Sequence, residues 1–117
     1  MIHAEILRLA SNDHIDWSDF AAYEPIDPFD DFGWFHVTVG ATGIEGGNDF
    51  QVCVSTHRAV GRVRRAGAVP GVIVDCFDAE SVDTAIRDRI ASIAADSWDQ
   101  IVNECRTFML WEYEKYH

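Results

Sequence analysis

The sequence has no long hydrophobic run. No segment approaches the roughly 20 consecutive apolar residues that a helix needs to span a bilayer, and the opening Met-Ile-His-Ala-Glu-Ile-Leu lacks the basic and apolar regions of a signal peptide. We therefore expect a cytoplasmic protein without a membrane partner. The 117 residues are 48% hydrophobic and 25% charged, which is typical of a globular protein. We expect a single domain over residues 1–117.

Motifs for catalysis and for metal or cofactor binding are also missing. The glycine-rich stretch 43–47 lacks the Lys-Ser/Thr ending of a phosphate loop, and no Cys-x-x-Cys or His-Glu-x-x-His spacing is present for zinc. His36-Val-Thr38 has the His-x-Thr form that cyclic-phosphodiester enzymes use in pairs, but no second copy exists. Asp30 and Asp31 lie in a hydrophilic loop, where neither carboxylate is desolvated for acid-base work. We predict a protein that is not an enzyme, with no catalytic residue, metal or cofactor.

Cysteine is scarce. Cys53, Cys76 and Cys105 are an odd number of cysteines far apart in the chain, and each lies in an apolar periodic segment. Free cysteine in such a segment usually behaves as a small buried hydrophobic residue. We expect three buried thiols.

Basic residues are few in the first half of the chain. Residues 1–50 contain ten acidic side chains and one basic side chain, Arg8. This half of the chain therefore carries −9 of the net charge of −11. Such a surface repels nucleic acid and anionic membrane and speeds encounter with a basic partner. The same charge is also compatible with a surface that only aids solubility.

An acidic segment with two prolines carries much of this charge. Pro25 and Pro28 fix their own φ angles and favour extended backbone at the residues before them, which predicts outward-pointing carboxylates. Aromatic side chains beside the acids are candidate anchors for a partner, although each could equally belong to the core. The predicted binding residues are Glu24, Asp27, Asp30, Asp31, Tyr23, Phe29 and Trp17.

Alternating apolar residues predict strands over 2–9, 34–39 and 50–55. In the second of these, Trp34, His36 and Thr38 face away from the apolar side. Four glycines within residues 40–48 predict a long-looped hairpin between the second and third strands. Residues 11–22 are expected to form a loop or one helical turn.

The second half of the chain mixes strand and helix patterns. Residues 56–67 predict a short basic helix or loop, and residues 71–77 form a β-branched run typical of a central strand. Asp78 is the expected cap of a helix of about 17 residues. Arg89 falls within the apolar arc of that helix, which predicts a snorkelling stem or a carboxylate partner.

A second helix is expected to start at Ser97, where Gln100 completes a capping box. It either continues to Tyr116 or breaks near Met109 and is followed by a strand over 110–113; we favour the break. The pattern as a whole predicts an α+β fold: an antiparallel-rich sheet of four to five strands with two C-terminal helices packed on one face.

The segment Tyr-x-Pro-x-Asp-Pro at 23–28, followed by Asp-Phe-Gly-Trp-Phe at 31–35, resembles the opening signature of the Immunity protein 8 family of bacterial polymorphic-toxin systems. The similarity continues through Gln-Val-Cys-Val-Ser-Thr at 51–56, Asp-Ser-Trp at 96–98 and Trp-Glu-Tyr-Glu-Lys-Tyr at 111–116, and it covers residues 23–56 and 71–116. Two features depart from the family pattern: the glycine often found near Met109 is absent, and residues 58–69 match no part of it.

This resemblance implies an immunity protein that binds the C-terminal domain of a cognate toxin, as in contact-dependent growth inhibition. Together with the acidic surface, it leads us to predict a basic nuclease as the toxin and blockage of its active site as the mechanism. The alternative is a non-catalytic acidic adaptor or structural subunit of a larger assembly.

Overall fold

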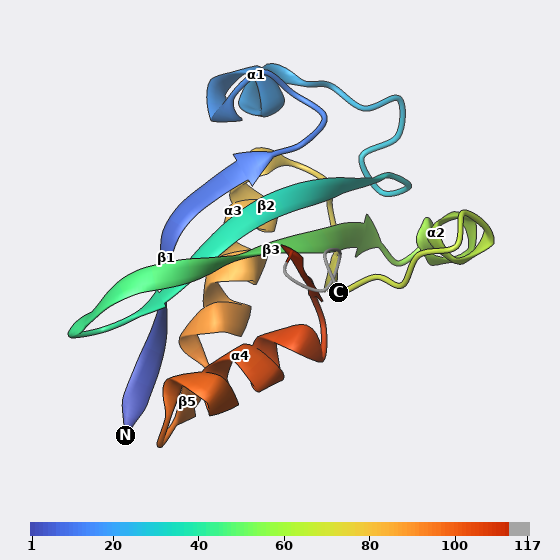
Figure 1. Ribbon diagram of the computed structural model, residues 1–117. Helices are drawn as coiled ribbons and strands as arrows, with labels where there is room; N and C mark the ends of the chain where they lie inside the picture. The colour runs from blue at the N-terminus through green and yellow to red at the C-terminus, as the bar shows by residue number, and fades with distance from the viewer. Residues whose placement is uncertain (113–117) are drawn as a thin grey trace.

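The segments with alternating apolar residues form a sheet, and most segments with helical spacing pack against it (Figure 1). The computed structural model describes residues 1–112. Its elements are, in chain order, β1 (Ile2–Ser11), α1 (Trp17–Ala22), β2 (Phe32–Ala41), β3 (Ile44–Thr56), α2 (Val60–Arg65), β4 (Val72–Val74), α3 (Ala79–Ala91), β5 (Ala94–Ala95), α4 (Trp98–Arg106) and β6 (Leu110–Trp111).

The strand order in the sheet is β4-β3-β2-β1-β5, and β6 pairs with β3. All pairings are antiparallel except β3 with β4, which is parallel. The α+β class, the antiparallel-rich sheet and the predicted hairpin are confirmed. The sheet has six strands because β5 and β6, each of two residues, pair with β1 and β3.

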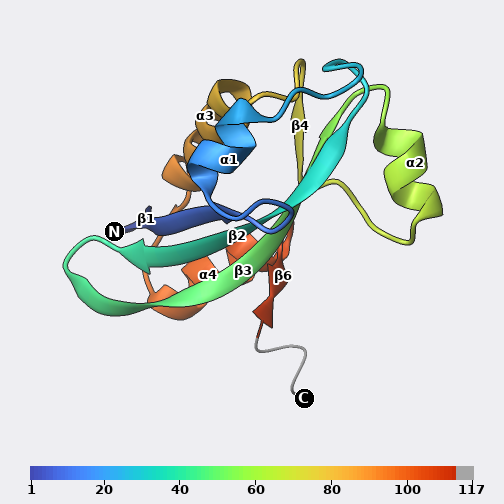
Figure 2. The same cartoon turned by 90° about the horizontal axis from the view of Figure 1, so that it is seen from above.

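One face of the sheet holds the core. Phe35, Val37 and Val39 of β2 point to this face and are at most 1% exposed, as the alternation predicts. The helices α1, α3 and α4 contribute buried residues to the same cluster, and Figure 2 shows α2 apart from them, beyond the end of β3. The opposite face, called the outer face below, carries Trp34 and His36, which are only half-buried.

The helix starts follow the local signals in the sequence. Asp78 caps α3 by accepting a hydrogen bond from the backbone N–H of Ser81, at 2.7 Å. Ser97 and Gln100 form the predicted capping box of α4. Each cap satisfies backbone donors that would otherwise have no partner.

Two sequence expectations for the strands and turns need correction, and a third is confirmed. Residues 72–74 form an edge strand, not a central one, and Ile73 is 47% exposed. The hairpin has no long loop, because Thr42 and Gly43 make a tight turn in which Gly43 adopts a φ of +80°, and β3 continues through the following glycines. The chain breaks after α4 as favoured, and β6 covers Leu110–Trp111; the rest of the expected 110–113 strand at Tyr113, and Tyr116, lie outside the described residues.

Two further expectations, on helix length and on cysteine burial, also differ. The helix that starts after Asp78 has 13 residues. Arg89 in this helix is half-buried, and its guanidinium carbon lies 4.0 Å from the centroid of the Phe108 ring, a contact that the sequence did not predict. Cys53 and Cys105 are buried, whereas Cys76 is only half-buried because it follows the short edge strand. Within residues 1–112, no helix is long and apolar enough to cross a membrane.

Candidate functional site

The acidic loop, residues 23–31, joins α1 to β2 and is held by hydrogen bonds from its own backbone. The Asp27 carboxylate accepts from the N–H of Phe29 at 2.9 Å, and the N–H of Asp30 donates to the Asp27 carbonyl at 3.1 Å. The Pro28 carbonyl accepts from the N–H of Phe77 at 2.7 Å, which ties the loop to the start of α3. The loop therefore has a defined conformation.

Asp31 fixes the two ends of the acidic loop to each other. Its Oδ2 accepts a hydrogen bond from the Tyr23 hydroxyl at 2.6 Å, and its N–H donates to Thr56 Oγ1 at 3.1 Å. The bond to Asp31, with some burial, raises the pKa of Tyr23 to about 12. Tyr23 is thus held in place and protonated while still 40% exposed.

The basic segment at α2 pairs with the acidic loop. Arg58 Nη1 lies 3.5 Å from Asp27 Oδ2, and Arg62 contacts both the carboxylate and the backbone carbonyl of Asp30. Both carboxylates remain partly exposed, at 44% and 34%. The expectation of outward, solvated carboxylates thus holds only in part, because two of the four already have a cationic partner within the chain.

The structure places the predicted aromatic anchors in different settings. Trp17 lies at the edge of the core, with its ring centroid 5.2 Å from that of Phe20. Tyr23 and Phe29 belong to the acidic loop, and Phe29 is 54% exposed. Ile26, which the sequence reasoning missed, is fully exposed between them. The loop thus presents apolar side chains among its carboxylates.

The end of the molecule formed by α1 and the acidic loop remains strongly acidic despite these ion pairs. Residues 13–31 contain seven acidic side chains, and no Lys or Arg occurs between residues 9 and 57. Glu24 is exposed and makes no hydrogen bond or ion pair within the described part of the chain. Arg58 and Arg62 offset two of these charges, so this end still favours cationic partners.

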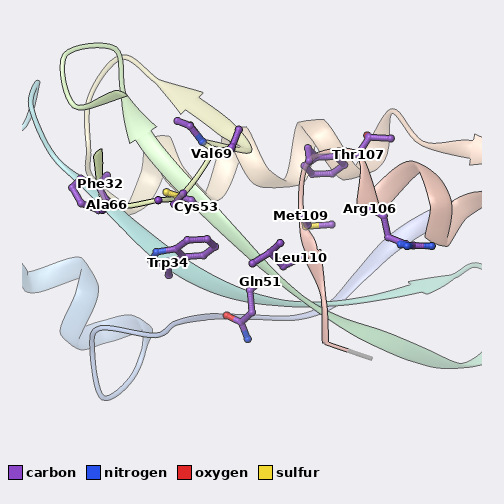
Figure 3. Close-up of a pocket in the computed structure, with 14 residues that line it drawn as sticks. Phe32, Trp34, Gln51, Cys53, Ala66, Val69, Arg106, Thr107, Met109 and Leu110 are labelled. Atoms are coloured by element: carbon purple, nitrogen blue, oxygen red, sulfur yellow. The ribbon is translucent and has the colours of Figure 1, made fainter. Parts of the chain in front are cut away.

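A groove of about 610 Å³ on the outer face, the outer groove, was not predicted (Figure 3). It lies between residues 66–70 after α2 and residues 106–110 around the turn into β6, with β2 and β3 as its floor. Its mostly apolar lining includes Phe32, Trp34, Cys53, Val69, Pro70 and Leu110. The outward position of Trp34 was the one signal in the sequence, since a large aromatic on the solvent side of a strand needs a neighbour.

A network of polar side chains lies beside the outer groove. His36 Nε2 is 3.0 Å from Asp49 Oδ1, and His36 Nδ1 is 3.2 Å from Glu112 Oε1. Gln51, which also lines the groove, donates to Glu112 Oε1 at 2.6 Å. A hydrogen bond from the Thr38 hydroxyl to the Asp49 carboxylate lowers the pKa of Asp49, and a hydrogen bond from His36 lowers it further. His36 is therefore a member of a surface network, and Glu112 of this network bonds Gln51 at the groove.

The chemistry of the remaining candidate groups is limited. Burial raises the pKa of the Cys53 thiol to about 11 and that of Cys105 to about 12, so both thiols stay protonated at neutral pH. Among residues 1–112, no group of three or more His, Cys, Asp or Glu side chains is arranged to hold a metal ion.

Comparison with known proteins gives one match. A family model described as Immunity protein 8 matches residues 5–116, a range that contains both the acidic loop and the segments that line the outer groove. No curated protein and no solved structure matches the chain.

Proposed function

The chain belongs to the Immunity protein 8 family, and from this membership we propose that it silences a basic nuclease toxin by covering the toxin's active site. Members of such a family are immunity proteins, which generally neutralise a cognate toxin by binding it and generally perform no catalysis. The proposal adds the kind of toxin and the way in which it is blocked.

The acidic end of the molecule carries this proposal. A nuclease active site is cationic because it must bind phosphates, and seven carboxylates within residues 13–31 offer negative charge in their place. The acidic loop that presents four of them, Glu24, Asp27, Asp30 and Asp31, is already ordered by hydrogen bonds within it and to the neighbouring strands. A pre-ordered loop loses little conformational entropy on binding.

Exposed aromatic side chains supply the contacts that charge alone does not. Tyr23 and Phe29 stand among the carboxylates of the loop and are large enough to bury substantial area against a partner. Trp17 holds α1, the helix that leads into the loop, against the core, since its ring packs against Phe20 and Phe35. We assign anchoring to Tyr23 and Phe29 and positioning to Trp17.

Titration tests the proposal directly. The toxin domain encoded beside this chain is purified, and the chain is added in known amounts to a nuclease assay. Inhibition that saturates near one equivalent and weakens as substrate is raised is the expected result. Complete inhibition by a small fraction of an equivalent would show turnover instead, and binding without loss of nuclease activity would indicate an adaptor.

A further inference from the structure

We propose that the outer groove binds the acidic loop of a second copy of this chain, with Ile26 and Phe29 of that loop seated in it. Because each chain has one groove and one loop, two copies form a symmetric dimer through two such contacts. The inference concerns the chain alone and goes beyond the proposed function.

The groove exposes apolar side chains that converge from separate segments. Val69 follows α2 and is 76% exposed, Leu110 begins β6 and is 50% exposed, and Trp34 of β2 is half-buried in the floor (Figure 3). Single exposed apolar residues are common on protein surfaces, but a hollow lined by several of them is typical of binding sites. The volume of about 610 Å³ is that of a pocket which holds more than one side chain.

Arginine side chains border the groove. They lie in its lining, at the end formed by Phe32, or directly before the 66–70 wall: Arg106, Arg62, Arg64 and Arg65. Glu112, next to the groove at Gln51, already accepts a hydrogen bond from Gln51 and lies 3.2 Å from His36 Nδ1. An apolar hollow with a basic border complements apolar side chains flanked by Asp or Glu.

The acidic loop presents this combination of side chains. Ile26 is fully exposed and Phe29 is 54% exposed, and Glu24, Asp27 and Asp30 stand beside them in the sequence. Neither apolar residue lines the groove of its own chain, so both are available to another molecule. A nucleic acid has no such side chains, and the acids of the loop would repel its backbone.

The groove and the acidic loop are neighbours, which allows both contacts of a dimer to form together. Arg62 contacts Asp30 of the loop and also lies over Phe32 of the groove, with 5.7 Å from its guanidinium carbon to the ring centroid. When two complementary surfaces lie side by side, a two-fold axis between them sets each surface against its counterpart in the other copy.

The net charge of −11 opposes association of two copies. At physiological ionic strength the Debye length is about 8 Å, so charges in contact count for more than distant ones. We therefore expect a weak dimer. Since the proposed function uses the same loop, a chain in this dimer cannot bind the toxin through that loop until the copies separate.

The walls of the groove are fixed before any partner arrives. The N–H of Gly71 donates to the Cys53 carbonyl at 2.9 Å, which holds the 66–70 wall against β3. The opposite wall is held by Arg89, whose guanidinium carbon lies 4.0 Å from the Phe108 ring centroid. A hollow with rigid walls binds with a small entropy cost.

The test uses the full chain by itself, so its outcome does not depend on any toxin. Sedimentation equilibrium at about 0.15 M salt follows dimer formation between about 1 and about 500 μM chain. The groove variant carries Val69→Ser and Leu110→Ser, and the loop variant carries Ile26→Ser and Phe29→Ser. Ile44→Ser is the control, because Ile44 is 41% exposed at the far tip of the β2–β3 hairpin.

We expect the parent chain to dimerise within this range, each double variant to raise the dimer Kd by about tenfold or more, and the control to stay within about twofold. Mixing the two variants tests whether loop and groove meet. The mixed dimer keeps one contact between an intact loop and an intact groove, so it should form about fivefold or more tighter than either variant alone.

Hydrogen exchange on the parent chain gives a readout that does not depend on a variant folding. Exchange at residues 24–30, 66–71 and 107–111 should be slower at high than at low chain concentration. A chain that stays monomeric up to about 500 μM would overturn the proposal and leave the proposed function intact.

Two other results would also overturn the proposal. A dimer in which mixing the variants restores nothing would place its interface elsewhere, because independent losses do not compensate each other. A monomeric chain whose 66–71 and 107–111 segments become protected only when the toxin domain encoded beside it is added would assign the groove to the toxin.

Discussion

The Arg62 guanidinium holds Asp30 by two contacts, one to its carboxylate and one to its backbone carbonyl at 3.1 Å. This places a helix residue from the middle of the chain against the end of the acidic loop. The pair is partly exposed, with 43% of the Arg62 side chain and 34% of the Asp30 side chain accessible. Its main effect is therefore on the conformation of the loop, since exposed ion pairs add little to global stability.

Arg62→Ala should loosen the acidic loop more than it lowers global stability. We expect faster hydrogen exchange at residues 27–31 and a loss in the free energy of unfolding of about 1 kcal/mol or less. Arg64→Ala, in the same helix and exposed, is the control. Equal exchange rates in the two variants would contradict a role for Arg62 in ordering the loop.

Glu24→Lys should slow association with the cognate toxin by about threefold to tenfold at low salt, with little change in koff, because an exposed charge acts mainly on the encounter. The difference should shrink as salt is added. Glu45→Lys makes the same change in net charge at the hairpin tip and should leave kon within about twofold. Association rates that fall equally in both variants would show that total charge, not the acidic end, steers the partner.

Gly71→Ala should destabilise the fold strongly. A Cβ at this position would lie 2.0 Å from the Phe108 carbonyl oxygen and 2.9 Å from a methyl group of Val52, so the backbone has to move. We expect a loss of about 1–3 kcal/mol in denaturant unfolding.

Gly61→Ala is the matched control for Gly71→Ala. Gly61 lies within α2, and its added Cβ would meet only the end of the Arg65 side chain at 3.4 Å. Alanine has a higher helix propensity than glycine, so we expect the free energy of unfolding to rise by about 0.5–1 kcal/mol. A neutral Gly71→Ala would mean that the two groove walls are not in contact in solution.

The lowered pKa of Asp49 predicts that the fold loses some stability in acid. Hydrogen bonds from Thr38 and His36 hold the pKa of Asp49 below its usual value, so its contribution is present above about pH 4 and is lost as pH falls through the lower folded-state pKa. The free-energy difference between the parent chain and Asp49→Asn should therefore shrink as pH falls from about 5 to about 2. The contribution of Asp49 to the free energy of unfolding is modest, because its side chain is 47% exposed. Asp88→Asn, on the surface of α3, is the control, and a difference independent of pH would contradict the prediction.

Local patterns predicted the parts of the fold that depend on neighbouring residues. Alternation placed Trp34 and His36 on the outer face, and Ser97 with Gln100 fixed the start of α4, because these signals act over a few residues. The edge position of β4 was not predictable from its β-branched composition, since that composition suits any buried strand.

The candidate site was predicted less completely than the fold. The acids of the loop were identified, but their partners Arg58 and Arg62 lie about 30 residues further along the chain. The outer groove unites β2, the segment after α2 and the start of β6, and no local pattern connects them. Such juxtapositions follow from tertiary packing and require the structure.

The pairing of β1 with β5 joins Ile2 to Ala95 and His3 to Ala94. During synthesis, β1 leaves the ribosome first but has no partner on this edge until most of the chain has followed. Contacts between residues so far apart slow folding, and an open strand edge is prone to pair with other chains in the meantime. The sheet of a newly made chain therefore stays incomplete at this edge until translation has passed Ala95, so the supply of folded protein lags behind the start of its synthesis.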